Sequence, residues 1–307
     1  MAIAVQAQWD TLSGQFAEVA EQASKFVVAV HGGGGRIAVS GILWRSGIVV
    51  TASYVLRRIG EYEVVLWDKS SKKASLAGRD PGTDLAVLRV EGSTSTTSQF
   101  ANADEIRVGQ VVLAIGRSTL GDLSASAGII ARLGDSWQTW RGGRVDRLLR
   151  PDVTLYRGQS GSALVDSRAR VLGMNTSALA RSAAITVPNT TVDRVVNEIL
   201  QHGGVFRPYL GLAMQPIAIP PELKTRFNLQ SETALMVMQV EASSPSADAG
   251  ITLGDVVVGI AGAPVQGIEE IQRALSITKR GDSVDVEYVR GGQLASVKVK
   301  LSDRPRN

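Results

Sequence analysis

Residues 41–58 read GILWRSGIVVTASYVLRR. Runs rich in apolar and β-branched residues surround an Arg-Ser-Gly break, and the second run ends at Thr-Ala-Ser, directly before Tyr54. β-branched residues suit a pleated, half-buried surface, so these runs predict strands. Tyr54 then lies where a strand ends, either as an aromatic residue of the core or as the altered member of a functional site.

Short runs of the same kind continue from Lys25 to Pro188. They recur roughly every 8 to 15 residues with Gly, Asp, Ser and Arg between them, a spacing typical of an all-β barrel or sandwich. Before them, Phe16, Val19 and Ala23 have helical spacing, which predicts one short amphipathic helix over residues 10–24.

A second helix is predicted over residues 189–204, where five apolar residues form one stripe and Gly203-Gly204 ends it. Beyond it, five or so short strands and two main helical patterns describe a small α+β barrel. A chain of 307 residues suits two domains. We therefore expect a helical segment over residues 1–24, a β domain over 25–203 and an α+β domain over 204–303.

The composition excludes several classes of site. The chain has no cysteine and only two histidines, so disulfides, thiolate chemistry and clustered histidine ligands are not expected, and neither a metal nor another cofactor is predicted. No apolar run approaches the roughly 18 to 20 residues that cross a bilayer. The N-terminal residues MAIAVQAQWDTLSGQ lack the pattern of a signal peptide, which favours a cytoplasmic over a periplasmic or secreted protein.

The densest basic stretch is WQTWRGGRVDRLLR at residues 137–150, within a chain whose formal net charge is +4. Arginines next to two tryptophans are compatible with a nucleic-acid patch. The Gly142-Gly143 pair marks a turn, which favours instead an exposed hairpin with solvated arginines and tryptophans on a core edge. A nucleic-acid partner is therefore not expected.

Two further stretches contain residues suited to nucleophilic chemistry. In LYRGQSGSALVD, Ser160 lies between glycines before a β run, so the backbone can expose the hydroxyl and direct two N–H groups to one point. In AGRDPGTDLAVLRV, Asp84 comes directly before an apolar strand, a frequent place for a buried orienting carboxylate. Taken alone, each stretch is also compatible with an ordinary turn.

Taken together, VVTASYV, DPGTDLAVLRV and GQSGSALVD resemble, in order, the TxAHV, TDxAV and GNSGGPL motifs of the HtrA/Deg family of trypsin-like serine proteases. The resemblance continues through AITVP and RPYLGL into a PDZ-like stretch, SSPSADAGITLGDVVVGIAGAPV. It implies a mainly β fold: a trypsin-like double six-stranded β-barrel, a small α+β PDZ domain after it, and a short N-terminal helix before it.

The resemblance places Ser160 on the nucleophile, Asp84 on the orienting acid, and the N–H groups of Gly158 and Ser160 on the oxyanion hole. Tyr54 falls on the general-base histidine, which is the main departure from the family pattern. Gln159, Ser162 and Ala163 replace the Asn, Gly and Pro of the family motif, which indicates relaxed constraint on the loop.

A phenol, with an ordinary pKa near 10, is a poor acceptor of the serine proton at neutral pH. Replacement by another base is not expected, because His31 precedes a glycine-rich turn that the resemblance places away from the cleft, and His202 ends the linking helix. We therefore predict an inactive peptidase that serves as a peptide-binding or scaffolding module. An active serine endopeptidase, with an unrecognised base or a partner that activates it, is the alternative.

In the PDZ-like half, the resemblance places a carboxylate-binding loop at Tyr209, Leu210, Gly211 and Leu212. Ile271 and Leu275 would line a side-chain groove, although apolar residues of this kind are also compatible with a core. The expected partners are peptide or protein C-termini. The family resemblance also implies a homotrimer assembled through the N-terminal segment, with Trp9 and Phe16 as packing aromatics.

Overall fold

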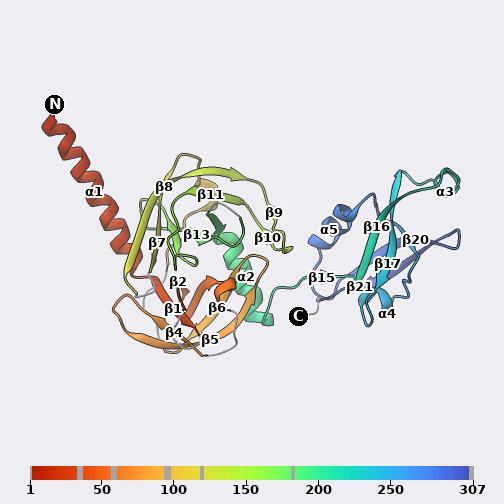
Figure 1. The fold of residues 1–307 in the computed structure, drawn as a ribbon, viewed down its shortest axis with the longest axis horizontal. Coiled ribbons are helices and arrows are strands. Elements are labelled where there is room, and N and C mark those ends of the chain that lie inside the picture. Colours follow the sequence, from red (N-terminus) through yellow and green to blue (C-terminus); the bar gives the residue numbers. More distant parts are fainter. Residues whose placement is uncertain are drawn as a thin grey trace. The chain divides into compact units, whose positions relative to one another are not determined.

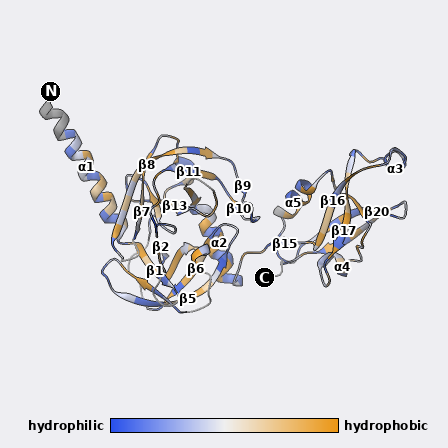
Figure 2. Cartoon of the chain, in the orientation of Figure 1, coloured by the Kyte–Doolittle hydropathy of each residue, from blue (hydrophilic) through white to orange (hydrophobic). Residues whose placement is uncertain are grey.

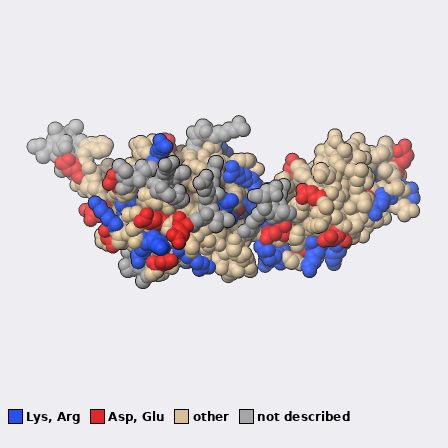
Figure 3. All heavy atoms as spheres, turned by 60° about the horizontal axis from the view of Figure 1, so that its bottom comes forward, with Lys and Arg blue, Asp and Glu red and all other residues tan. Residues whose placement is uncertain are grey.

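The protein is described here from a computed structural model that covers residues 2–32, 37–56, 61–92, 98–117, 121–180 and 184–303. The chain divides into two compact units, Met1–Val205 and Phe206–Asn307 (Figure 1). Basic and acidic side chains are interspersed on the face that Figure 3 shows. No helix in the described ranges is long and apolar enough to span a membrane.

The first barrel consists of six antiparallel strands that close in the order β1-β2-β3-β6-β5-β4 (Figure 1). All five residues of β3 are buried, so the β-branched run before Tyr54 belongs to the core. Hydrophobic residues dominate β1 and β6 (Figure 2). The strands are β1 Val27–Gly32, β2 Ile37–Arg45, β3 Ile48–Ala52, β4 Tyr62–Val65, β5 Ser71–Asp80 and β6 Leu85–Val90.

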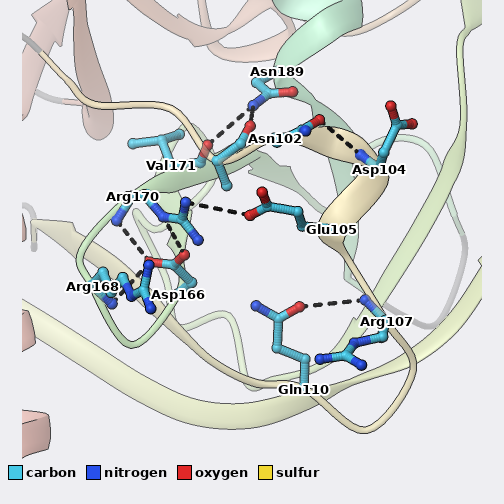
Figure 4. A network of polar contacts seen from close by, with 11 residues as sticks. Asn102, Asp104, Glu105, Arg107, Gln110, Asp166, Arg168, Arg170, Val171 and Asn189 are labelled. Atoms are coloured by element: carbon cyan, nitrogen blue, oxygen red, sulfur yellow. Dashed lines mark hydrogen bonds and ion pairs between the residues drawn. The ribbon is translucent and has the colours of Figure 1, made fainter.

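The second barrel closes in the order β11-β14-β13-β12-β7-β8. Its strands are β7 Val111–Arg117, β8 Leu123–Gly134, β11 Leu148–Asp152, β12 Ala163–Val165, β13 Val171–Thr176 and β14 Ile185–Pro188. The turn between β12 and β13 is fixed by Asp166, which accepts hydrogen bonds from the backbone N–H groups of Arg168 and Arg170 and pairs with the Arg170 guanidinium (Figure 4). Arg170 also reaches Glu105 of the short 3₁₀ helix η2, Ala103–Glu105.

Two helices accompany the barrels. Helix α1 runs over Ala2–Ser24 and begins well before residue 10, where the sequence pattern placed its start; its first residues are good helix formers even though they lack an apolar stripe. Val19 and Ala23 pack into the barrel core, whereas Trp9 is 64% exposed. Helix α2 covers Asn189–His202 and ends at Gly203, which has the left-handed conformation that the predicted C-cap requires.

The second unit contains a six-stranded sheet whose main path runs β16-β17-β18-β20-β21, with β16 at one edge and β19 off this path. A separate pair joins β15 to β22, and β19 pairs with β18. The strands are β15 Pro208–Tyr209, β16 Leu212–Ala218, β17 Thr233–Val240, β18 Val256–Ile260, β19 Ala263–Pro264, β20 Ser283–Arg290, β21 Gln293–Lys300 and β22 Ser302–Asp303. The helices are α3 Pro221–Phe227, α4 Pro245–Asp248 and α5 Ile268–Ser276. The predicted fold class, two six-stranded barrels with a small α+β unit after them and a helix before them, is confirmed.

Candidate active site

The first barrel supplies Tyr54 and Asp84. Tyr54 lies in the 3₁₀ turn η1, Ser53–Val55, which follows β3. Its backbone N–H donates to Asp84 Oδ1 at 2.8 Å, and the N–H of Ser53 donates to the Asp84 carbonyl at 2.9 Å. Asp84 directly precedes β6 and has a left-handed φ of 58°, a conformation that Asp tolerates better than most residues. These bonds fix the two residues relative to each other.

Asp84 is fully buried. Its Oδ2 accepts a 2.5 Å hydrogen bond from Thr176 Oγ1, at the end of β13 in the second barrel. Burial raises the pKa of this carboxyl from 3.8 to about 6, although the hydrogen bonds from Thr176 and Tyr54 and the charge of Arg141 act in the opposite direction. The ionised form is therefore held at a cost in free energy.

Ser160 lies in the turn before β12 and is 5% exposed. Its Oγ accepts a hydrogen bond from the Tyr54 hydroxyl at 3.0 Å and lies 3.2 Å from Ser177 Oγ. The structure thus brings Tyr54, Asp84 and Ser160, predicted from three distant motifs, into one hydrogen-bonded cluster. No imidazole is among the partners of Ser160 that the described chain provides.

The turn is held against the first barrel by Ser40 of β2. The Ser40 N–H donates to the Gly158 carbonyl at 2.8 Å. Gly161 has φ of 90°, and a β-carbon at this position would lie 2.0 Å from the Ser40 carbonyl oxygen. Only glycine adopts this φ readily and also leaves room for the carbonyl oxygen. A steric requirement therefore explains the second glycine of the motif.

The N–H groups of the turn divide into two sets. Those of Gln159, Gly161 and Ser162 donate to backbone carbonyls. Those of Gly158 and Ser160 have no acceptor among the described residues. The turn therefore leaves two N–H groups, on either side of Gln159, available to an external oxygen.

The three residues that depart from the family motif are packed into the structure. Gln159, Ser162 and Ala163 are all fully buried. The Gln159 side chain accepts from the N–H of Tyr156 and donates to Ser124 Oγ, and Ser162 Oγ accepts from the Asn175 amide. Gln159 and Ser162 thus hold the turn through hydrogen bonds of their own.

Sequence reasoning missed Thr176 and Ser177, which contact Asp84 and Ser160 respectively. Both follow the β run VLGMN and are brought to the site by pairing of β13 with β12 and β14. The available signal was the polar Asn-Thr-Ser sequence at the end of an otherwise apolar strand.

The two histidines have other places. His31 lies on β1, opposite Ala38 of β2 and Glu63 of β4. His202 is the last residue of α2. Neither is hydrogen-bonded to Ser160. The described residues also contain no group of three or more His, Asp or Glu side chains arranged to hold a metal ion.

The basic stretch forms a hairpin of β9, Trp137–Gln138, and β10, Arg144–Val145. It packs on the loop before Asp84, because Thr139 Oγ1 donates to the Gly82 carbonyl at 2.7 Å and a β-carbon on Gly143 would lie 2.3 Å from the Gly82 carbonyl carbon. The hairpin therefore contacts the loop that leads into Asp84.

In the second unit, the predicted peptide-binding residues differ in exposure. Leu210 is buried, Gly211 has φ of 78°, and Leu212 begins the edge strand β16. Tyr209 lies on β15, and its hydroxyl donates to Glu241. Ile271 on α5 is 3% exposed and belongs to the core, whereas Leu275 is only partly buried. The structure thus gives Ile271 the core role that the sequence also allowed.

Two family models match the chain. The trypsin-like peptidase domain matches residues 39–174 and the PDZ domain matches residues 208–301. A serine protease Do-like HtrA of Lactobacillus helveticus is 32% identical over 270 residues, which cover 83% of this chain and 65% of that protein. A probable periplasmic serine endoprotease DegP-like of Pseudomonas fulva is 29% identical over 89% of this chain and 58% of its own length. The chain thus spans only about three fifths of the length of these relatives.

Solved structures are similar over nearly the whole chain. A serine endoprotease from Yersinia pestis has a TM-score of 0.74 at 24% identity and covers 94% of this chain and 98% of its own. The HtrA-type protease AlgW with a tripeptide has a TM-score of 0.70 at 25% identity and covers 95% of this chain and 98% of its own. These likenesses agree with the barrels and the α+β unit described above.

The expected cytoplasmic location is wrong. Relatives from Pseudomonas fulva, Haemophilus influenzae and Bartonella henselae are named as probable periplasmic proteases, which contradicts that expectation. The expectation had rested only on the absence of a signal-peptide pattern from the first residues of the sequence. From the two domain matches and these relatives, the chain is similar to HtrA-type serine proteases, with a match to the trypsin-like peptidase domain followed by a match to the PDZ domain.

Proposed function

We propose that this HtrA-like protein binds peptides without cutting them, because its Ser160 lacks a base. The observation that carries the proposal is the 3.0 Å contact between Ser160 Oγ and the Tyr54 hydroxyl. Tyr54 stands where the family motif TxAHV has its histidine. The proposal thus assigns Ser160 to the nucleophile position, Asp84 to the acid position, and the free N–H groups of Gly158 and Ser160 to the oxyanion hole.

The chemical reason is proton transfer. A serine hydroxyl attacks a carbonyl only when a neighbouring group takes its proton in the transition state. The Tyr54 hydroxyl donates a hydrogen bond to Ser160 Oγ instead of accepting one from it. Removing the histidine of a serine-protease triad lowers turnover on the order of a millionfold. Ser160 is therefore a hydrogen-bond acceptor in a shaped cleft rather than an attacking group.

Asp84 does not supply the missing base. In a triad the acid holds the imidazole in orientation, and its charge stabilises the imidazolium. Here the carboxylate accepts from Thr176 Oγ1 and from the backbone N–H of Tyr54. Its position is thus that of an orienting acid, with a phenol in place of the group it would orient.

The PDZ domain supplies the peptide-binding function. PDZ domains add an extended peptide to a sheet edge and hold its terminal carboxylate in a backbone nest. Strand β16 is at an edge of its sheet, and the loop before it contains Gly211, whose β-carbon would lie 2.2 Å from Ser244. We assign Tyr209, Leu210, Gly211 and Leu212 to the carboxylate loop, and Leu275 to the side-chain groove.

The names of the relatives support the proposed compartment, and the family resemblance implies the proposed assembly. We propose a homotrimer in the periplasm, with α1 in the contact between subunits. Trp9 is 64% exposed on this helix, whereas Phe16 packs partly against the barrel core. A trimeric mass in light scattering that falls to the monomer in Trp9→Ser supports this assembly, and a monomeric mass of the unmodified protein contradicts it.

An active endopeptidase is the second candidate. Its support is that the relatives are named as serine proteases and that the turn leaves the N–H groups of Gly158 and Ser160 available. In this case, another group takes the Ser160 proton when substrate or a partner binds.

Casein hydrolysis separates the two candidates. The unmodified protein, Ser160→Ala, Tyr54→His, Tyr54→Phe and the double variant Tyr54→His with Ser160→Ala are each incubated with fluorescent casein. We expect cleavage only with Tyr54→His, since Asp84 Oδ2 has a second lone pair for the imidazole Nδ1–H. Tyr54→Phe is the matched control, because it removes the hydroxyl without adding a base. Cleavage by the unmodified protein that Ser160→Ala abolishes contradicts the proposal.

A further inference from the structure

The basic stretch 137–150 contains one arginine that the hairpin does not use. The Arg141 guanidinium lies 4.4 Å from the Trp140 ring centre, Arg144 pairs with Asp146, and Arg147 donates to the Ala103 carbonyl. The Arg150 side chain on β11 has no ion pair or hydrogen bond within the described ranges. An unpaired guanidinium on a barrel strand is free to bind a ligand.

A second unpaired arginine lies beside it. Arg132 of β8 is the direct register partner of Arg150, so their side chains leave the sheet on the same face. The Arg132 side chain also lacks an ion pair or hydrogen bond in the part of the chain that the structure describes. Like charges directly opposite each other on neighbouring strands are destabilising. The pair therefore has an electrostatic cost that an anion between the two guanidinium groups would relieve.

Both arginines line a cavity of about 670 Å³. The cavity also includes Ser177, whose Oγ is 3.2 Å from Ser160 Oγ. It thus opens beside the candidate nucleophile. Its other described walls are mainly apolar and contain one carboxylate: Ala131, Pro151, Asp152, Val153, Leu155, Ala180 and Ala184.

We propose that this cavity receives an acidic side chain, aspartate or glutamate, of a peptide that lies across Ser160. A planar guanidinium binds a carboxylate through two parallel N–H bonds, and two opposed guanidinium groups can hold one carboxylate between them. Among the described residues that line the cavity, Asp152 offsets one of the two positive charges, so their net charge suits one carboxylate better than a doubly charged phosphate. The apolar walls contact the methylene groups of the same side chain. This inference rests on the proposed peptide-binding function and adds to it a preference for peptides with an acidic side chain.

The test uses fluorescein-labelled decapeptides of alanine, valine and serine with one central residue varied. The first peptide carries a central glutamate and the second a glutamine, both with an amidated C-terminus that removes the terminal carboxylate a PDZ domain needs. The third carries glutamine and a free C-terminus. Fluorescence anisotropy measures binding of each to the full chain, to Arg132→Gln and to Arg150→Gln. Arg89→Gln, an exposed arginine on β6 of the first barrel, is the matched control.

We expect the amidated glutamate peptide to bind about tenfold more tightly than its glutamine counterpart, since two charge-assisted contacts are gained at an exposed site. Arg132→Gln and Arg150→Gln each remove most of this difference, whereas Arg89→Gln retains it. Equal binding of the two amidated peptides, or a preference that survives both variants, overturns the inference.

The third peptide separates the two sources of carboxylate. Binding of the free-acid peptide alone, with no binding of either amidated peptide, places recognition at a C-terminus: the inference fails and the peptide-binding function stands. Failure of all three peptides to bind contradicts both.

Discussion

Replacing Asp84 by asparagine is predicted to stabilise the barrels at neutral pH. Asparagine keeps an acceptor for the Tyr54 N–H and tolerates the left-handed φ of 58°. Its amide can donate to Thr176 Oγ1, so the site stays hydrogen-bonded without a buried charge.

The size of this gain in stability follows from the raised pKa of the Asp84 carboxyl. A change from 3.8 to about 6 corresponds to about 3 kcal/mol. The pKa of Asp84 is higher in the folded protein than in the unfolded protein. The stability that the protonated carboxyl provides is therefore fully present below pH 3.8 and is lost as pH rises through about 6. Asp84→Asn is therefore expected to be about 2–3 kcal/mol more stable than the unmodified protein at pH 8, with little difference below pH 4.

Urea unfolding followed by tryptophan fluorescence measures this difference. All five tryptophans lie within Met1–Val205, so the signal reports the barrels and not the PDZ domain. Asp166→Asn is the control, since its buried carboxylate pairs with Arg170 and its loss should destabilise the barrels at pH 8. If Asp84→Asn is the less stable protein at pH 8, a cation balances Asp84 and the reasoning is refuted.

Three further substitutions test other contacts. Thr176→Val removes the hydrogen bond to Asp84, which should raise the pKa of that carboxyl further and cost about 1–3 kcal/mol at pH 8 in the same urea experiment; unchanged stability contradicts the bond. Gly161→Ala places a β-carbon 2.0 Å from a β2 carbonyl oxygen at φ of 90° and should cost more than about 3 kcal/mol, and a cost below about 1 kcal/mol would show that the turn has room. Gly211→Ala should weaken binding of a free-acid peptide at least tenfold, measured by anisotropy, because its β-carbon meets Ser244; unchanged affinity argues against the assigned loop.

The fold could be predicted from local patterns because they agree with the tertiary structure. The β-branched run before Tyr54 is the fully buried β3, and the glycine pair after α2 provides its left-handed cap. The start of α1 could not be predicted from periodicity, since its first turns lack an apolar stripe.

The site was predictable only in part. Ser160, Asp84 and Tyr54 were found because each lies in a short motif, whereas Thr176 and Ser177 reach the site through strand pairing across the second barrel. Burial of the substituted loop residues also required the structure, because a single sequence does not show which side chains fill the space behind a turn. The opposed Arg132 and Arg150 depend on strand register, which their separation in sequence does not reveal.

Covalent labelling by a fluorophosphonate probe tests the central claim most directly, because phosphonylation requires an activated Ser160 and no substrate specificity. We expect the unmodified protein to be labelled at least about a hundredfold more slowly than Tyr54→His, the usual contribution of a general base. Ser160→Ala should abolish labelling of the Tyr54→His variant. Rapid labelling of Ser160 in the unmodified protein, at a rate close to that of Tyr54→His, would contradict the account.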